Sequence, residues 1–306
     1  MTLQNAALVD TLHERMGSQP TYPLRDTSQY EGRLWVRLVG HDGAHKPKGD
    51  GVRGSEGAKF DHHTYALQLG SDMHRDDDGE GKITAAGAYL THAQSTDKVT
   101  HYDGRHAGKS TLDGTSLGAY WTRFYPKGSY LDLVGQITSY RLSMQSPQTW
   151  ALRSNGKGFT LSAEGGHSFE LNEHWVLQPQ VQVRVQRGEL GSVEDGSSRV
   201  RFEDVKSTVG RLGLRVAYDK EKTSFWARAD VLREFEGKFG TVVSNMAGLN
   251  GQMAYSSLKG NSVALSLGAE AKLSKTMSIY ASGRTERRMG DRGHYNSLML
   301  GAKWAF

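Results

Sequence analysis

The sequence contains no cysteine, only six prolines, and no run approaching the roughly 18 apolar residues of a membrane-spanning helix. Without cysteine, the protein has neither a disulfide framework nor a zinc–thiolate site. Hydrophobic residues make up 37% of the sequence, and the mean hydropathy is −0.59. Taken alone, these values suggest a polar soluble protein. They also suit a membrane barrel, in which only alternate residues face lipid.

Charge does not point to a nucleic-acid ligand. The formal net charge is +5, but the 38 Lys and Arg residues are scattered rather than clustered in one run. No nucleotide-binding motif is found. The first residues lack the basic and apolar regions of a signal peptide. If the protein is a barrel, we expect it to be the C-terminal piece of a longer protein whose signal lies upstream.

Residues 2–17 form the one segment that favours a helix. Ala, Leu, Glu, Arg and Met are good helix formers, Gly17 is a natural stop, and Pro20 and Pro23 break the chain after it. The apolar face of this segment is thin, so it does not resemble half of a helical core.

From residue 33 onward the hydrophobic pattern has a period of two, which is the period of a β-strand. In the clearest case, 175–186, the residues Trp175, Leu177, Val181, Val183 and Val185 alternate with Gln178, Gln180, Gln182, Arg184 and Gln186. Such alternation predicts a strand with one apolar and one polar face. The whole pattern predicts twelve strands, at 33–43, 59–72, 81–95, 112–126, 131–138, 159–164, 175–186, 211–218, 222–237, 263–272, 276–288 and 293–306.

Strand length and connection length both favour a membrane barrel. Most runs exceed the five or six residues of a typical soluble strand and reach the roughly 9–11 of a tilted membrane strand. Short connections are predicted near 73–80, 126–129, 170–173, 219–222 and 274–275, and long polar ones near 44–58, 96–111, 144–155, 189–205 and 238–257. Alternation of short and long connections is typical of periplasmic turns and external loops.

Aromatic residues towards the ends of the apolar faces predict an interfacial girdle. They are Tyr65, Tyr89, Trp121, Trp175, Tyr218, Trp304 and Phe306. The last strand places Leu298, Leu300, Ala302, Trp304 and Phe306 on one face and ends on an aromatic residue. This resembles the C-terminal strand by which outer-membrane proteins are recognised by their assembly machinery, and it assigns that signal to Leu298, Leu300, Trp304 and Phe306.

Over nearly all of its length the sequence resembles the translocator (β) domain of a monomeric, pertactin-like autotransporter, which is type Va of type V secretion. The segments that carry the resemblance follow one another in the expected order, at 12–17, 35–37, 210–214, 231–236 and 278–282, before the final strand. The resemblance implies an all-β fold, a twelve-stranded antiparallel transmembrane β-barrel with an N-terminal α-helix inside the lumen. Residues 1–32 would be the lumen helix and linker, and 33–306 the outer-membrane barrel.

The function that the resemblance implies is secretion. The barrel would anchor in the bacterial outer membrane and allow its N-terminal passenger to reach the cell surface, with the helix plugging the pore. Expected partners are outer-membrane lipid, the barrel assembly machinery, periplasmic chaperones and the protein's own passenger. We expect a monomer, without nucleic acid, cofactor or metal.

Charged residues on the polar parity would face the lumen and predict contacts to the helix. The helix offers Asp10, Glu14 and Arg15, and the wall offers Arg37, Arg184, Arg211, Arg215, Arg228 and Glu270, with Glu164, Asp230 and Arg284 on the same parity. Each of these charges could instead serve only to hydrate the lumen.

Candidates for chemistry are few. Residues 114–118 match G-x-S-x-G but lie within a predicted strand with no helix after it. The acidic turn 76–80 lacks the spacing of a calcium loop, and His62 and His63 point to opposite faces of a strand. Some autotransporters cut the passenger free inside the barrel, one subgroup at an Asn–Asn pair, but here Ala6 follows Asn5. Asp10 and Glu164 are left as candidates for carboxylate-assisted self-cleavage.

Three alternatives to a translocator stay open. An outer-membrane barrel enzyme, protease- or lipase-like, would need catalytic residues at strand ends or in loops, and no convincing set is found. A passive porin-like channel would not need the N-terminal helix. A soluble lipocalin-like binder would have shorter strands and an apolar interior.

Overall fold

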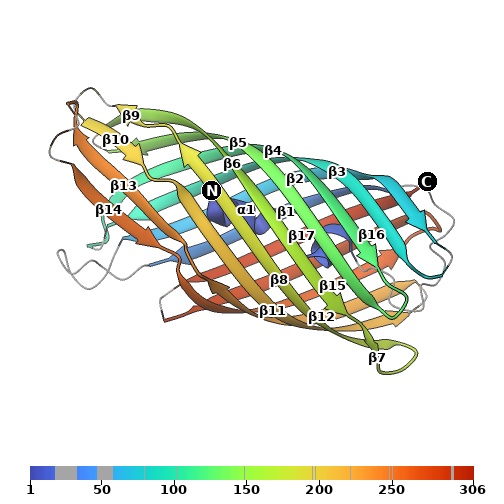
Figure 1. Ribbon diagram of the computed structural model, residues 1–306. Coiled ribbons are helices and arrows are strands. Elements are labelled where there is room, and N and C mark those ends of the chain that lie inside the picture. Colours follow the sequence, from blue (N-terminus) through green and yellow to red (C-terminus); the bar gives the residue numbers. More distant parts are fainter. Residues whose placement is uncertain are drawn as a thin grey trace.

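The computed structural model describes residues 1–17, 33–46, 58–78, 80–101, 103–147, 149–194, 196, 198–220, 222–247, 249, 251–290 and 293–306. They form one seventeen-stranded antiparallel sheet that curls into a barrel with two short helices inside (Figure 1). Among these residues, no helix is both long and apolar enough to cross a membrane.

Twelve strands form the closed ring of the barrel. They are β1 (Arg33–His45), β2 (Lys59–Asp77), β3 (Ile83–Thr100), β4 (His106–Phe124), β5 (Ser129–Ser146), β6 (Thr149–His167), β8 (Trp175–Leu190), β11 (Val205–Lys220), β12 (Thr223–Glu234), β15 (Gly260–Lys272), β16 (Met277–Met289) and β17 (His294–Ala305). The last strand pairs with the first over its whole length, from Arg33 opposite Ala305 to Ala44 opposite His294. This pairing removes the free edges that an open sheet would expose, and it confirms the predicted fold class.

Alternation along the strands separates an apolar outer face from a polar inner face. On β8, Gln178, Gln180 and Gln182 are buried in the lumen, while Val181 and Val183 are about half exposed on the outside. Exposed aliphatic residues surround the ring, among them Leu38, Leu67, Leu69, Leu90, Leu117, Ile137, Leu161, Leu212, Val231, Leu265, Leu267, Leu298 and Leu300. A soluble protein rarely exposes so large an apolar surface, whereas a membrane barrel covers it with lipid.

Five further strands lie outside the ring. β7 (Phe169–Glu170) extends one turn, whereas β9 (Val193–Glu194), β10 (Ser198–Phe202), β13 (Lys238–Asn245) and β14 (Gln252–Ser257) form an extension at the other end of the barrel (Figure 1). The C-terminus lies at the end opposite this extension. The tight turns fall at that same opposite end, so the usual pattern of short periplasmic turns predicts that this is the periplasmic end and that the extension is external.

The predicted loops are too long, and this part of the sequence interpretation is wrong. Most of 96–111 and 144–155 is strand, and the loops 189–205 and 238–257 contain the four extension strands. Ring strands reach 19 residues, well beyond the roughly 9–11 that cross a membrane. Outside the membrane both faces of a strand are wet, so the hydrophobic alternation disappears although the hydrogen-bonded ladder continues. Residues 47–57 of the predicted loop 44–58 lie outside the described residues.

The predicted helix over 2–17 is two helices, α1 (Thr2–Leu8) and α2 (Leu12–Met16). Val9, at φ −103° and ψ 74°, has left the helical conformation. Thr11 is the N-cap of α2 and has extended backbone angles. The helix α2 ends at Gly17 with a φ of 69°, which glycine adopts without strain. The rest of the predicted linker, 18–32, lies outside the described residues. The domain boundary at residue 33 therefore stays a prediction, although β1 begins there.

Inward-facing aromatic rings lie directly over glycines of the neighbouring strand. Any Cβ at these glycines would collide with the ring opposite. The register pairs are Trp35–Gly70, Tyr89–Gly118, Tyr120–Gly87, Tyr130–Gly166, Trp226–Gly268, Tyr280–Gly301 and Tyr295–Gly43. Tyr89 was expected in the outer girdle and instead faces the lumen, 3% exposed. Its strand carries small apolar residues on both parities, so alternation could not orient it.

Candidate functional site

The occupied lumen is the candidate functional site. Residues 1–17 lie inside the barrel, and most of their side chains are buried although the two helices are only seven and five residues long. Helices this short have no stability of their own in water. The barrel wall must therefore hold them in place, and its contacts define the site.

The break between α1 and α2 is held by polar side chains of the wall. The carbonyl oxygen of Val9 accepts a hydrogen bond from Arg184 at 3.0 Å, and that of Asp10 accepts one from Gln182 at 3.3 Å. Arg37 and Gln68 both donate to the carbonyl oxygen of Leu8. Backbone groups released from a helix in a membrane protein need such partners. The wall supplies them, so the break is a fixed feature of the site.

A buried ion-pair network joins α2 to β12. The Arg228 guanidinium donates two bonds to the Glu14 carboxylate, at 2.8 and 2.9 Å, and one to Thr11 Oγ1 at 2.9 Å. Its Nε donates to Asp230 at 2.9 Å. The side chain of Arg228 is fully buried and that of Glu14 is 6% exposed. A bidentate guanidinium–carboxylate pair fixes orientation as well as charge, so this contact sets the angle of α2 in the lumen.

The Asp230 carboxylate pairs with three arginines next to that contact. Arg211 and Arg284 bind its carboxylate at 2.8 and 2.9 Å, in addition to Arg228. Arg211 also pairs with Glu164 at 3.2 Å. Buried charges are tolerated only when paired and hydrogen-bonded, and here each guanidinium reaches a carboxylate. The wall of the lumen is thus a connected charged lattice, and α2 contacts it through Glu14.

A second buried pair holds the opposite side of α2. Arg15 donates to both oxygens of Asp132, at 2.6 and 3.1 Å, and its guanidinium lies 4.5 Å from the centre of the Tyr120 ring. Near the helix end, Tyr280 Oη donates to the carbonyl of Arg15 at 2.8 Å, and Lys303 Nζ donates to that of Met16 at 3.2 Å. Together these contacts seat the C-terminal end of the helical segment against β4, β5, β16 and β17.

An apolar contact complements the charges. Val9, Leu12 and Met16 pack with a buried aromatic patch from β1, β3, β4 and β5 that includes Trp35, Tyr89, Tyr120 and Tyr130. The thin apolar stripe of residues 2–17 therefore meets ring faces rather than water. These rings reach the helix because their partner residues are glycines.

The predicted contact residues fall into three groups. Hydrogen bonds join Arg37, Arg184 and Arg228 directly to residues 8–14, and Glu14 and Arg15 to the wall. Arg211 and Glu270 each reach the helical segment through one intermediate residue, Glu164 and Lys303 respectively. Arg215 lies over the Trp226 ring at 5.6 Å, and no bond joins it to the helices among the described residues.

Several contact residues were missed from the sequence, chiefly because they are uncharged. Gln68, Gln178, Gln182 and Tyr280 bond to the helical segment, as does the carboxylate of Asp132. Gln178 and Gln182 do carry a usable signal, since they stand on the polar parity of 175–186. A prediction of contacts from charged residues alone leaves these glutamines out.

The two cleavage candidates both lie at the break. The Asp10 carboxylate accepts a bond from the backbone N–H of Thr11 at 2.9 Å, and that of Glu164 is 3.4 Å from the N–H of Leu12. Glu164 also accepts a bond from Tyr130 Oη at 2.6 Å and pairs with Arg211. Its oxygens are thus already engaged. A role for either residue in cleavage stays a prediction.

The described residues contain no group of three or more His, Asp or Glu side chains arranged to hold a metal ion. His62 faces the lumen and pairs with Asp97 at 2.6 Å, whereas His63 is exposed on the outside. Residues 114–118 are part of β4, as expected. Leu298, Leu300, Trp304 and Phe306, the predicted assembly signal, stand at or just beyond the closing strand β17, and the first two are exposed outward.

Known proteins share both the sequence pattern and the barrel. The Autotransporter beta-domain family matches residues 34–284. The chain belongs to this family. The pertactin autotransporter of Bordetella parapertussis is 31% identical over 185 residues, which is 57% of this chain and 19% of the relative. The BrkA autotransporter of Bordetella pertussis is 30% identical over 246 residues, or 76% of this chain and 23% of the relative.

Solved structures share the fold. The transport unit of AIDA-I from Escherichia coli superposes with a TM-score of 0.80 at 20% identity, covering 100% of this chain and 97% of that one. The translocator domain of NalP from Neisseria meningitidis gives 0.66 at 16% identity, covering 92% and 90%. The chain spans about a fifth of the length of the pertactin relatives. It is an outer-membrane translocator barrel of the type V secretion class, and the barrel is closed by one polypeptide.

Proposed function

We propose that this autotransporter barrel secretes its own passenger, which would precede residue 1, and that residues 1–17 then plug the pore. The observation that carries the proposal is the direction of the helical segment. Near its start, Gln4 donates to the carbonyl oxygens of Ala93 and Leu112, and Asn5 donates to Tyr140 Oη. Near its end, the carbonyl oxygen of Met16 accepts a hydrogen bond from Lys303, which lies close to the last residues of β17.

The segment therefore runs from the periplasmic end of the barrel at Gly17 towards the external end at Met1. A polypeptide continuing from residue 1 would leave the barrel on the cell-surface side. The passenger would remain tethered because the twelve ring strands are fixed in the membrane. A passive porin is disfavoured, because two buried bidentate ion pairs hold the segment in the lumen.

The remaining partners are proposed from the outer wall. The aliphatic belt suits outer-membrane lipid, which would cover it. The closing strand, with Leu298 and Leu300 outward and Phe306 at its end, is the segment we assign to the barrel assembly machinery. Periplasmic chaperones would act before closure, while these apolar faces are exposed. The resemblance carries these assignments.

Surface display tests the function. A signal peptide and a small epitope-tagged reporter are placed before residue 1, and proteinase K is added to intact cells. We expect the tag to be digested. As a matched control, the same tag inserted into the turn at 126–128, at the periplasmic end, is expected to be protected. Protection of the first tag together with digestion of the second would reverse the orientation and refute the proposal.

A further inference from the structure

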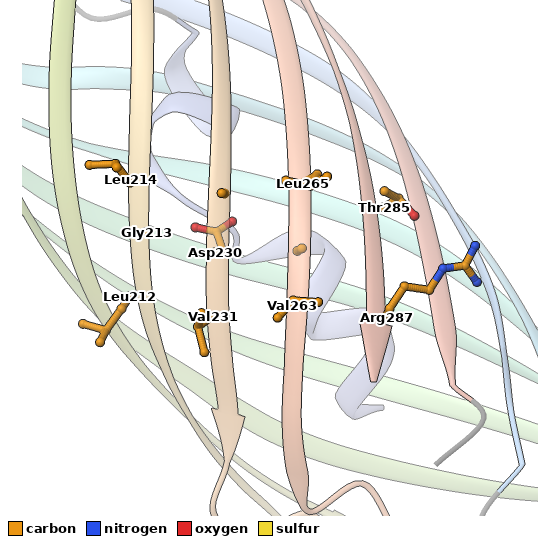
Figure 2. A pocket seen from close by; sticks show the side chains of 11 residues that line it. Leu212, Gly213, Leu214, Asp230, Val231, Val263, Leu265, Thr285 and Arg287 are labelled. Carbon is orange, nitrogen blue, oxygen red and sulfur yellow. The ribbon is translucent and has the colours of Figure 1, made fainter. Parts of the chain in front are cut away.

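A groove crosses the outer wall of the barrel between β11, β12, β15 and β16. Figure 2 shows its lining residues on these strands, with the helices of the lumen behind them. Leu212, Leu214, Val231, Val263 and Leu265 form its sides, and the open groove has a volume of about 560 Å³. It lies on the lipid-facing side, because these side chains are between 41% and 66% exposed.

The groove exists because a small residue stands between two large ones. Ala229 on β12 is directly opposite Leu214 on β11 and Leu265 on β15. All three point outward, so the missing side-chain volume at Ala229 opens a trough between the two leucines. A trough lined by aliphatic side chains and closed beneath by the sheet suits a hydrocarbon tail.

Two arginines stand at the external end of this groove. Arg287 on β16 lines it and is opposite Val263, while Arg233 on β12 is opposite Asn261, two residues further along β15. With neighbouring strands about 4.8 Å apart and a rise of about 3.4 Å per residue, their Cα atoms lie roughly 12 Å apart. Two arginine side chains can close on one phosphate-bearing group placed between them.

These arginines differ from several other basic residues near the external rim. Lys59, Lys157 and Arg187 pair with Asp61, Glu189 and Glu236, at 2.8, 3.2 and 2.9 Å. In the described part of the protein, no carboxylate pairs with Arg233 or Arg287, and Arg233 lies only against the Phe235 ring at 5.4 Å. The outward positions of β11, β12, β15, β16 and β17 carry no Asp or Glu. Among the described residues, the outward strand positions of this sector therefore carry positive charge and no acidic side chain.

We propose that the groove binds one phosphorylated lipid of the outer leaflet, with an acyl tail between Leu214 and Leu265 and its phosphate between Arg233 and Arg287. Guanidinium groups bind phosphate oxygens in a bidentate, charge-assisted geometry. The aliphatic lining lies on the membrane side of the two arginines, which is the order in which an outer-leaflet lipid presents its tail and its phosphate. The assignment does not depend on secretion of a passenger.

Native mass spectrometry of the detergent-folded barrel, titrated with purified lipid A, tests the site. Three variants are compared with the wild type: the pair R233Q and R287Q, which removes the charges; A229F, which fills the trough but keeps them; and R141Q. Arg141 is the matched control, because it also faces outward on the external half of its strand but lies on β5, away from the groove. Heat-modifiable migration on gels shows which variants are folded.

We expect at least about tenfold weaker binding for the double variant and for A229F, and unchanged binding for R141Q. Lipid A stripped of its phosphates should bind the wild type as weakly as intact lipid A binds the double variant. Equal losses in R141Q, or full binding by A229F, would overturn the site. A dimer of barrels that A229F abolishes would assign the groove to a second copy and overturn it as well. If the double variant does not fold, the A229F and stripped-lipid comparisons still decide.

Discussion

We predict that the Glu14–Arg228 ion pair holds the helical segment in the lumen, and Glu14→Gln is the substitution that tests this prediction. Glutamine keeps the size and shape of the side chain but removes the charge that faces a fully buried guanidinium. Breaking a buried pair on one side costs about 3–5 kcal/mol. We expect the low end, about 3 kcal/mol, because Arg228 keeps Asp230 as a partner.

Since about 1.4 kcal/mol corresponds to a factor of ten, the equilibrium between the seated and released segment should shift towards release by about a hundredfold. Single-channel recording in planar bilayers measures this shift as the fraction of time spent at high conductance. A barrel lacking residues 1–17 gives the conductance of the fully open pore. We expect this conductance to exceed that of the wild type.

The control is Lys157→Ala, which removes an ion pair of similar length, 3.2 Å, whose partners are 80% and 58% exposed. Exposed pairs contribute little, so its open fraction should equal that of the wild type. If Glu14→Gln stays as closed as Lys157→Ala while the deletion is open, the pair does not hold the plug. If the deletion itself conducts no more than the wild type, the lumen is sealed by other groups and the plug is refuted.

Two further predictions concern the wall. In a urea titration, Gly118→Ala should lower the free energy of unfolding by about 1–3 kcal/mol, because its Cβ would collide with the Tyr89 ring. The control is Gly283→Ala, whose Cβ would lie 3.9 Å from the carbonyl oxygen of Ser297. Its free energy of unfolding should be nearly that of the wild type. Equal effects would contradict the aromatic–glycine packing. Replacing 240–255 by a short Gly-Ser linker should leave heat-modifiable migration intact, because β13 and β14 lie outside the closed ring; loss of the folded band would show that the extension supports the barrel.

Alternation of side chains was enough to predict the ring. On β8 the valines and glutamines that face lipid and lumen can be assigned from sequence alone, because water and lipid impose opposite requirements on the two faces. The prediction failed where that contrast is absent. Beyond the membrane both faces are wet, so the external ends of β3 to β6 read as loops. At Tyr89 both parities are small and apolar, so neither face is marked.

The site was predictable in kind but not in detail. The charges that face the lumen follow from parity, and Arg228 and Arg184 were among them. The break at Val9 does not follow, because Arg184, which bonds its carbonyl oxygen, lies 175 residues away in the sequence. Residues 2–17 have good local helix propensity, and partners of this kind override it. An additional signal was available and unused: glycines opposite aromatic residues in neighbouring strands mark rings that face the lumen.

The wall binds the backbone of the helical segment as well as its side chains. Carbonyl oxygens of Leu8, Val9, Asp10, Arg15 and Met16 each accept a bond from a wall side chain. Carbonyl groups are the same in every polypeptide, so these backbone hydrogen bonds do not distinguish one sequence from another. Selectivity for this segment then rests on its side chains. Chief among them are Glu14 and Arg15, whose partners Arg228 and Asp132 have opposite charges on different parts of the wall. Gln4, Asn5 and His13 add uncharged hydrogen bonds to the wall. A foreign linker that keeps an acidic and a basic residue at these two adjacent positions would find the same two charged partners on the wall.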